Sequence, residues 1–297
     1  MYNRDMTSNE NKEKLVKLKK EFDSLKQGKE SLLDIIFEAE LPESVYNSNA
    51  IENSTLTIAE TEKILMELEV SRDVSVREVF EAKNLANVFE YIRKKIKTIE
   101  VNKDSILFLH DMLIRTIDES IAGRFRKIGE FVRIGTYVAP APEHIEQMIN
   151  NTILEYSGSV NNLIIDRIAR FHLDFETIHP FNDGNGRIGR VLINLQLMQS
   201  GFPPVIIRDK EKVDYYESFK EYREKEKTSA LEKVILLGVF ESFHKRIAYL
   251  KGQKIIKLTE YAKSIDEKSQ NILNKAARQT IPAFREKGVW KIGIDRK

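Results

Sequence analysis

Apolar residues recur at spacings of three and four over most of this chain, a pattern that predicts amphipathic helices. The spacing is sustained over residues 76–99, 104–117, 162–177, 187–199, 213–226 and 228–251. A narrower apolar stripe lies among charged positions in residues 9–30 and predicts an exposed helix packed along one edge.

The helical spacing breaks after Gly123. The following residues, 124–138, alternate imperfectly between apolar and polar and include Gly129 and Gly135, so we expect a short β-hairpin at about 128–137. Pro140 and Pro142 follow and favour the start of another helix. The predicted fold is mostly α, with a helical core, one hairpin and a small C-terminal appendage.

This pattern divides the chain into an N-terminal helical extension (1–42), a core (43–250) and an appendage (251–297). The net charge of +2 conceals an asymmetry, because residues 251–297 hold 12 Lys and Arg against 5 Asp and Glu, a local net of +7. Solvated lysine-rich faces are the common reason for such a bias, and a packing or dimerisation unit is the default reading. The apolar pattern of this appendage also allows a degenerate winged helix, so a nucleic-acid-binding regulator acting through 251–297 is the alternative from another class.

Several classes of protein are disfavoured by composition. The longest apolar run, 234–240, is far too short for a membrane span, and the N-terminal residues lack an apolar signal region. The sequence has no cysteine, which fits a reducing compartment. We therefore expect a cytoplasmic protein with no membrane partner. The few histidines lack the spacing of a zinc site, and His110 and His172 are expected to be structural.

The segment from His179 to Arg190 concentrates the chemistry of the chain. Pro180, Asp183 and two glycines make residues 179–186 a predicted loop, and a helix follows from Arg187. A loop that leads into a helix presents free N–H groups and the positive end of the helix dipole, which together bind anions. Arg187 and Arg190 are one helical turn apart and can point to the same anion.

A phosphate site gives the neighbouring residues specific roles. Asp183 is a candidate ligand of Mg²⁺, which commonly accompanies bound phosphates, although it could instead cap the helix. His179 can accept a proton from an attacking hydroxyl. The residues alone thus indicate phosphoryl or nucleotidyl transfer.

The same segment resembles the Fic-domain signature His-x-Phe-x-Asp/Glu-Gly-Asn-Gly-Arg-x-x-Arg and matches it at every specified position. The resemblance covers roughly residues 43–245 and implies a helical bundle whose hairpin forms a flap ahead of the signature. It also implies a protein adenylyltransferase (AMPylator), which moves AMP from ATP to a Tyr, Thr or Ser hydroxyl of a target protein. Transfer of phosphate or phosphocholine is disfavoured, because those variants depart from the Gly-Asn-Gly-Arg-x-x-Arg pattern that is complete here.

The resemblance assigns a role to each position of the site. His179 is the base, Asp183 the Mg²⁺ ligand, and Phe181 an anchor of the loop. The ATP phosphates are assigned to Gly184, Asn185, Gly186, Arg187 and Arg190. Adenine is assigned to Tyr215 and Tyr216, and docking of the target to the flap residues Val132 and Ile134.

A second motif lies near the start of the core. Ser48, Glu52 and Asn53 fit a Ser-x-x-x-Glu-Asn pattern that resembles the helix restraining some Fic enzymes, here at about residues 44–56. Ser48 and Glu52 would share one helix face. A carboxylate held against Arg190 would take the place of the γ-phosphate, so the free enzyme is expected to be nearly silent.

One alternative activity stays open within the family. Glu52 could position a water for the reverse activity, removal of AMP from a modified protein (de-AMPylase). The flap would recognise the backbone of an extended segment, so the target protein is not identified by the sequence. Self-modification and a homodimer are further expectations for partners.

Overall fold

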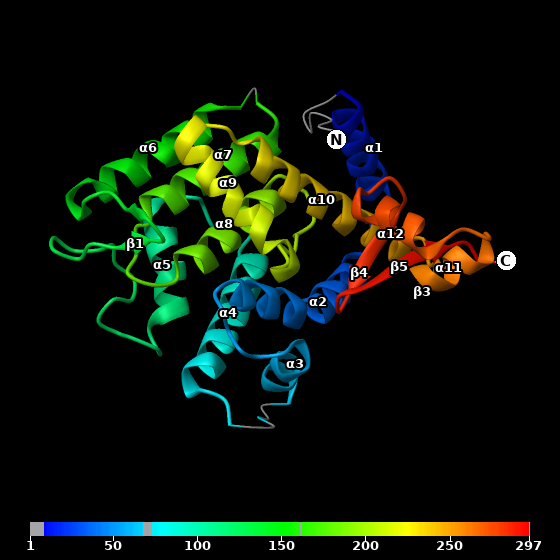
Figure 1. Ribbon diagram of the computed structural model, residues 1–297, viewed down its shortest axis with the longest axis horizontal. Helices are drawn as coiled ribbons and strands as arrows, with labels where there is room; N and C mark the ends of the chain where they lie inside the picture. The colour runs from blue at the N-terminus through cyan, green and yellow to red at the C-terminus, as the bar shows by residue number, and fades with distance from the viewer. Residues whose placement is uncertain (1–8, 68–69, 71–72, 161, 297) are drawn as a thin grey trace.

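The structure, a computed structural model, describes residues 9–67, 70, 73–160 and 162–296 (Figure 1). Its α-helices are α1 (Asn9–Leu25), α2 (Glu30–Ile51), α3 (Ile58–Met66), α4 (Val76–Lys94), α5 (Lys103–Ile114), α6 (Ile145–Gly158), α7 (Ile164–Ile178), α8 (Asn185–Gln199), α9 (Lys212–Lys225), α10 (Ser229–Leu250), α11 (Leu258–Ser264) and α12 (Ser269–Ala277). Short 3₁₀ turns, η1 (Pro142–His144) and η2 (Asp209–Glu211), precede α6 and α9. The mostly α prediction is confirmed. Within the described residues, no helix has the length and apolar character needed to cross a membrane.

Helices α7 and α8 form the centre of the fold (Figure 1). One face of each packs into an apolar cluster with α4 and α5, to which α8 contributes Ile188 and Leu192. The opposite faces pack into a second cluster with α1, α9 and α10, to which α8 contributes Ile193 and Leu197. Because α8 is buried on both sides, the polar residues at its start have fixed positions.

The predicted helix positions agree with the structure to within a few residues, except at one place. Helix α2 runs unbroken from Glu30 to Ile51, with Pro42 inside it, so the predicted boundary between residues 42 and 43 falls within this helix. The inhibitory element expected at about 44–56 therefore comprises the last turns of α2 and the turn that follows them. A separate helix, α3, follows that turn.

The predicted hairpin is present but shorter than expected. Strand β1 (Arg133–Ile134) pairs with β2 (Tyr137–Val138), and Gly135 takes a φ of 59° in the turn between them. The hydroxyl of Tyr137 donates a hydrogen bond to the carbonyl of Thr177 on α7 over 3.2 Å. This bond fixes the hairpin, called the flap below, beside the end of α7.

The C-terminal residues form a small unit with its own apolar cluster. Strand β3 (Lys254–Lys257) and β4 (Ala283–Glu286) each pair antiparallel with β5 (Val289–Ile294), and α11 and α12 lie between β3 and β4 in the chain. This order of helices and strands is that of a winged helix. The three-stranded sheet is an addition to the single hairpin that the sequence pattern predicted.

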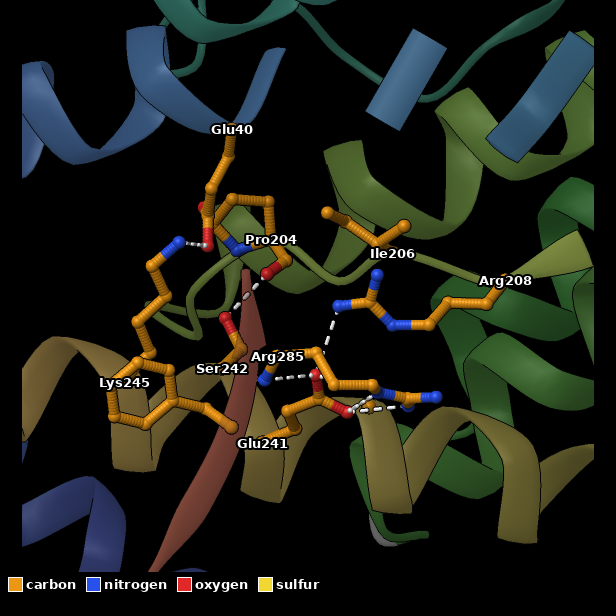
Figure 2. Close-up of a pocket in the computed structure, with 10 residues that line it drawn as sticks. Glu40, Pro204, Ile206, Arg208, Glu241, Ser242, Lys245 and Arg285 are labelled. Carbon is orange, nitrogen blue, oxygen red and sulfur yellow. Dashed lines mark hydrogen bonds and ion pairs between the residues drawn. The ribbon is translucent and has the colours of Figure 1, made fainter. Parts of the chain in front are cut away.

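Buried ion pairs attach the C-terminal unit to the core (Figure 2). Glu241 on α10 lies between Arg208 and Arg285, at 2.9 Å from the first and 2.6 Å from the second. Arg208 also pairs with Glu43 on α2. Glu43 accepts hydrogen bonds from the backbone N–H groups of Lys287 and Gly288, at the turn between β4 and β5. Helix α2 is therefore bonded to α10 and to the C-terminal hairpin together.

We predict that Glu241→Gln lowers the free energy of unfolding by about 3 kcal/mol, because it leaves buried arginines without their anion. Burial alone would raise the pKa of the Glu241 carboxyl, but Arg208 and Arg285 hold it below its usual value. The stability that this group contributes is therefore present at neutral pH and lost as the pH falls through the lowered pKa. Urea unfolding of wild type and variant should show a gap at pH 7 that narrows in acid.

The control is Glu217→Gln on α9, whose carboxylate is exposed and makes only a 3.9 Å pair with Lys220. It should change the free energy of unfolding by less than about 0.5 kcal/mol. Equal effects of the two substitutions would contradict the structural role of the buried network.

Candidate functional site

The loop between α7 and α8 is shaped by two residues in the left-handed region. His179 follows the last residue of α7 with a φ of 49°, and Gly184 precedes the first residue of α8 with a φ of 84°. A side chain at Gly184 would also lie 3.2 Å from Leu113 and Ile114. The loop thus reverses the chain tightly and leaves the N-terminus of α8 facing His179.

Phe181 anchors this loop as predicted. Its ring is fully buried and stacks on the ring of His110, with 3.7 Å between centroids. His110 accepts a hydrogen bond from the Gly123 N–H at Nδ1 and lies 3.0 Å from the Asp183 carbonyl at Nε2. The predicted structural role of His110 is thereby specified: it joins α5 to the loop.

Asn185 also supports the loop from within. Its amide oxygen accepts from the Phe181 N–H over 2.9 Å, and its amide nitrogen donates to the Phe181 carbonyl over 2.8 Å. Only 2% of the residue is exposed. The side chain thus holds the loop, and the contact of Asn185 with phosphate stays a prediction.

Arg126 is a loop support that the sequence did not reveal. Its buried guanidinium donates to the carbonyl oxygens of His179, Glu130 and Pro140, each over 2.9 Å. Its backbone N–H donates to the Pro180 carbonyl over 2.9 Å. Arg126 thus ties the end of α7 to the base of the flap, which places the flap beside His179.

The imidazole of His179 is largely enclosed. Its Nδ1 is buried without a hydrogen-bond partner among the described residues and lies 3.8 Å from a carboxylate oxygen of Glu176. Burial lowers the pKa of His179 to about 4, and the backbone carbonyl of Glu176 opposes this effect only in part. The ring is therefore neutral at physiological pH and able to accept a proton.

Asp183 lies between two arginines. One carboxylate oxygen is 2.8 Å from Arg187, and the other pairs with Arg77 on α4. Burial would raise the pKa of Asp183, but these two cations lower it below its usual value. Arg187 also lies 3.2 Å from Glu81, so its charge is balanced by two carboxylates.

Arg190 is a buried cation of the site that makes several hydrogen bonds. Its side chain is 4% exposed and donates 2.8 Å hydrogen bonds to the Ser48 carbonyl and to a carboxylate oxygen of Glu52. A further bond, from Nε to the Ser48 hydroxyl, measures 3.0 Å. The hydroxyl of Tyr215 lies 3.4 Å from the remaining nitrogen. The predicted contact of Ser48 and Glu52 with Arg190 is present.

Helix α2 ends at the point where Glu52 meets the loop. Asn53 follows with a φ of 67°, and its side-chain oxygen accepts from Lys212 over 2.8 Å. A carbon added at Gly186 would lie 2.2 Å from the Glu52 carboxylate. Glycine at 186 therefore gives Glu52 room to rest on the first turn of α8.

The two tyrosines assigned to adenine have different environments. Tyr215 is 1% exposed, and its hydroxyl lies 2.8 Å from His172, which places it in the buried support of Arg190. Tyr215 thus has little exposed surface to offer adenine, and its assignment to the base stays a prediction. Tyr216 is 39% exposed and donates a hydrogen bond to the carbonyl of Ile51 at the end of α2. Tyr216 remains a candidate surface for the base.

The flap residues Val132 and Ile134 are half-buried, on the strand and at its start. The docking role assigned to them stays a prediction. Two other apolar side chains of this region, Phe131 and Val138, are exposed.

Some residues of the site were not predicted, because their sequence context does little to indicate their role. Arg77 is one of many charged positions on an exposed helix face. Gly189 carried a stronger signal, because glycine inside a helix often marks close packing. A carbon added there would lie 2.6 Å from Glu176 and 2.7 Å from His172, so α7 and α8 could not approach as they do.

No group of three or more acidic, His or Cys side chains that could enclose a metal ion occurs in the described part of the chain. Asp183, just before the N-terminus of α8, is the acidic residue of the loop itself. A divalent ion there would have to take its remaining ligands from a bound phosphate compound and from water.

Comparison with known proteins identifies the domain that holds this site. Residues 100–197 match the model of the Fic/DOC family. Protein adenylyltransferase Fic of Nematostella vectensis is 35% identical over 178 residues, which cover 58% of this chain and 41% of the relative. Protein adenylyltransferase fic-1 of Caenorhabditis elegans is 29% identical over 248 residues, which cover 82% and 45%. The chain thus spans less than half the length of these curated relatives.

Solved structures share the fold. A Fic-domain-containing signaling protein from Bacteroides thetaiotaomicron superimposes with a TM-score of 0.71 over 81% of this chain and 97% of that one, at 23% identity. Fic-1 of Caenorhabditis elegans gives a TM-score of 0.66 over 81% of this chain and 72% of that one, at 25% identity. Residues 100–197 therefore match the Fic/DOC family, as the signature predicted, and the chain shares the fold of these Fic proteins.

We predict that Phe181→Ala destabilises the protein by about 3–5 kcal/mol, because it removes a fully buried ring from a packed core. Phe131→Ala, which removes a ring 63% exposed on the flap side, should cost far less. Denaturant unfolding of both variants checks the difference. If Phe181→Ala unfolded like wild type, the loop would be held by its polar contacts alone.

Proposed function

We propose that this Fic-domain chain is a protein adenylyltransferase, which moves AMP from ATP to a hydroxyl of a target protein and is restrained by its own Glu52. The observation that carries the proposal is the loop between α7 and α8. It brings a neutral imidazole, a carboxylate and two arginines to the start of one buried helix. The names of the relatives support the same activity.

The N-terminus of α8 suits the phosphates of ATP. The N–H groups of a first helical turn lack helical partners, and the helix dipole adds positive charge. Arg187 and Arg190 would supply bidentate donors for the terminal phosphates. Gly184 and Gly186 allow close approach of the backbone, and Tyr216 offers a ring for the base.

Asp183 would hold Mg²⁺ in this arrangement. Magnesium commonly binds one or two carboxylates together with the phosphates of a nucleotide, and Asp183 could serve as such a ligand. Bound there, the ion would neutralise charge on the phosphates. Arg77 and Arg187 balance the Asp183 carboxylate in this structure, so the exposed Arg77 would have to withdraw when the ion binds.

The transfer step forms a bond between the target oxygen and the α-phosphorus and breaks the bond from that phosphorus to the oxygen of pyrophosphate. His179 accepts the proton of the attacking hydroxyl. Nε2 is the accepting atom, since Nδ1 is buried against Glu176. Pyrophosphate leaves with its charge neutralised by the arginines. Positioning and charge neutralisation supply most of the rate in such reactions.

The flap positions the target. An extended segment can add to the free edge of β1 or β2 through backbone hydrogen bonds, with Val132 and Ile134 beside it. Arg126 and Tyr137 hold the flap against the end of α7, so a paired segment would present its hydroxyl near His179.

Restraint follows from competition for Arg190. The guanidinium cannot hold the Glu52 carboxylate and a γ-phosphate in the same place. A nucleotide bound while Glu52 remains would lack this contact, and a shift of its reacting atoms by about 1 Å can lower the rate a hundredfold.

We predict that His179→Ala abolishes AMP transfer in the Glu52→Gly background while ATP affinity changes less than about threefold. The base acts on the target hydroxyl, whereas the phosphates are bound by the loop and the arginines. Calorimetry measures the affinity for ATP, and assays with α-labelled ATP measure AMP transfer. A parallel loss of ATP affinity would show that His179 also binds the nucleotide.

We predict that Glu52→Gly raises AMP transfer at least tenfold, seen first as self-modification. The reason is that Arg190 becomes available to the γ-phosphate. Adding Arg190→Ala should erase the gain, because the two residues act through one contact. Transfer of label from α-labelled ATP measures all three proteins.

The control for this series is Glu38→Ala, which removes an exposed carboxylate from the same helix. It should leave transfer at the wild-type level. Flat or reduced transfer in Glu52→Gly would overturn the restraint. Loss of AMP release from pre-modified target in the same variant would indicate that Glu52 serves the reverse reaction.

A further inference from the structure

Glu176 is a buried acid of the site that the Fic signature does not contain. It lies on the last turn of α7, three residues before His179, and only 6% of it is exposed. One carboxylate oxygen, Oε1, has no hydrogen-bond partner among the described residues. The other, Oε2, is 3.8 Å from Nδ1 of His179, a buried atom that is also acted on by the backbone carbonyl of Glu176.

Space for this carboxyl comes from Gly189 on α8. Any side chain there would meet Oε1 of Glu176 at 2.6 Å. The carboxyl group is therefore accommodated by a glycine on the opposing helix. Its Oε2 lies toward His179, and its Oε1 has no hydrogen-bond partner among the described residues.

The chemistry of His179 gives such an acid a purpose. When the imidazole accepts the proton of the target hydroxyl, it becomes a cation in an enclosed site, and burial disfavours that cation. A carboxylate beside Nδ1 offsets this cost and holds the ring with Nε2 toward the hydroxyl, as in other acid–histidine pairs. The backbone carbonyl of Glu176 can orient the ring but carries no net charge.

We propose that Glu176 is the positioning residue of His179 and that its carboxylate stabilises the imidazolium formed during transfer. The proposal rests on the proposed function for the transfer step. The part that concerns the charge states of Glu176 and His179 applies to the protein without bound nucleotide or target.

The charges around Glu176 set its state. Burial and the Glu52 carboxylate raise the pKa of Glu176 to about 8, while Arg190 lowers it. The remaining titratable neighbours, His172 on α7 and Tyr215 on α9, have pKa values shifted by burial toward their neutral forms. His179 itself faces Arg126 and Asp183 as well. Removal of the Glu52 carboxylate should therefore favour ionisation of Glu176.

Carbon-13 and nitrogen-15 NMR of the nucleotide-free protein tests the electrostatic part without any assay of transfer. The Glu176 carboxyl signal, identified by its loss in Glu176→Gln, should titrate above pH 7 in wild type and at least about one unit lower in Glu52→Gly. The ring signals of His179 should show an inflection at the same midpoint, absent in Glu176→Gln. The proposal would be overturned if Glu176 titrated in the ordinary acid range with Glu52 present. It would also be overturned if the His179 signals showed no inflection at the Glu176 midpoint.

The transfer part is tested in the Glu52→Gly background. Adding Glu176→Gln, which keeps size and shape, should lower kcat at least tenfold, leave the KM for ATP within about twofold, and remove the rise of kcat with pH at the Glu176 midpoint. The exposed Glu155→Gln on α6 should change none of these. A pH profile that keeps its shape in Glu176→Gln would overturn the positioning role.

The outcomes separate this proposal from the proposed function. If Glu52→Gly transfers no AMP while Glu176 and His179 titrate together, the adenylyltransferase assignment fails and the coupling of the pair stands. If Glu52→Gly transfers AMP and the pair does not titrate together, the positioning role fails and the activity stands.

Discussion

The burial of one cation, Arg190, is the constraint on which the rest of the site depends. A buried guanidinium is costly unless charge and hydrogen bonds compensate it. Compensation here comes from the carbonyl and hydroxyl of Ser48, the carboxylate of Glu52 and the hydroxyl of Tyr215. These groups belong to α2 and α9, so both helices must dock on α8. An anion that replaces Glu52 must also compensate the charge of Arg190 and accept its hydrogen bond, and a phosphate can do both.

Helix α2, which ends just before Glu52, is attached to the rest of the protein by ion pairs near its middle. Glu40 pairs with Lys245 and Arg246 on α10, and Glu43 pairs with Arg208 and the C-terminal hairpin. Glu52 itself is 38% exposed and lies after the last helical residue. Its carboxylate can therefore leave Arg190 by a local rearrangement, without release of α2 from its buried ion pairs. The restraint and the stability of the fold are carried by different parts of one helix.

The sequence predicted the elements that depend on local pattern. Helical spacing located α4 to α10, the turn residues located the flap, and the signature located the loop with His179 and Arg190. Contacts between distant segments could not be predicted. Nothing in the sequence indicates that Arg126 bonds three carbonyl oxygens around the loop, or that Tyr215 is buried while Tyr216 is exposed. The bonds of the Asn185 amide to Phe181 likewise depend on how the loop folds.

The central claim is that Glu52 occupies the position that Arg190 offers to the γ-phosphate. Crystal structures of wild type and Glu52→Gly, each with Mg²⁺ and a non-hydrolysable ATP analogue, test it most directly. The account predicts that Arg190 contacts the γ-phosphate in Glu52→Gly but remains on Glu52 in wild type, with the phosphates displaced. A γ-phosphate bound to Arg190 in both proteins, with Glu52 still in place, would contradict it.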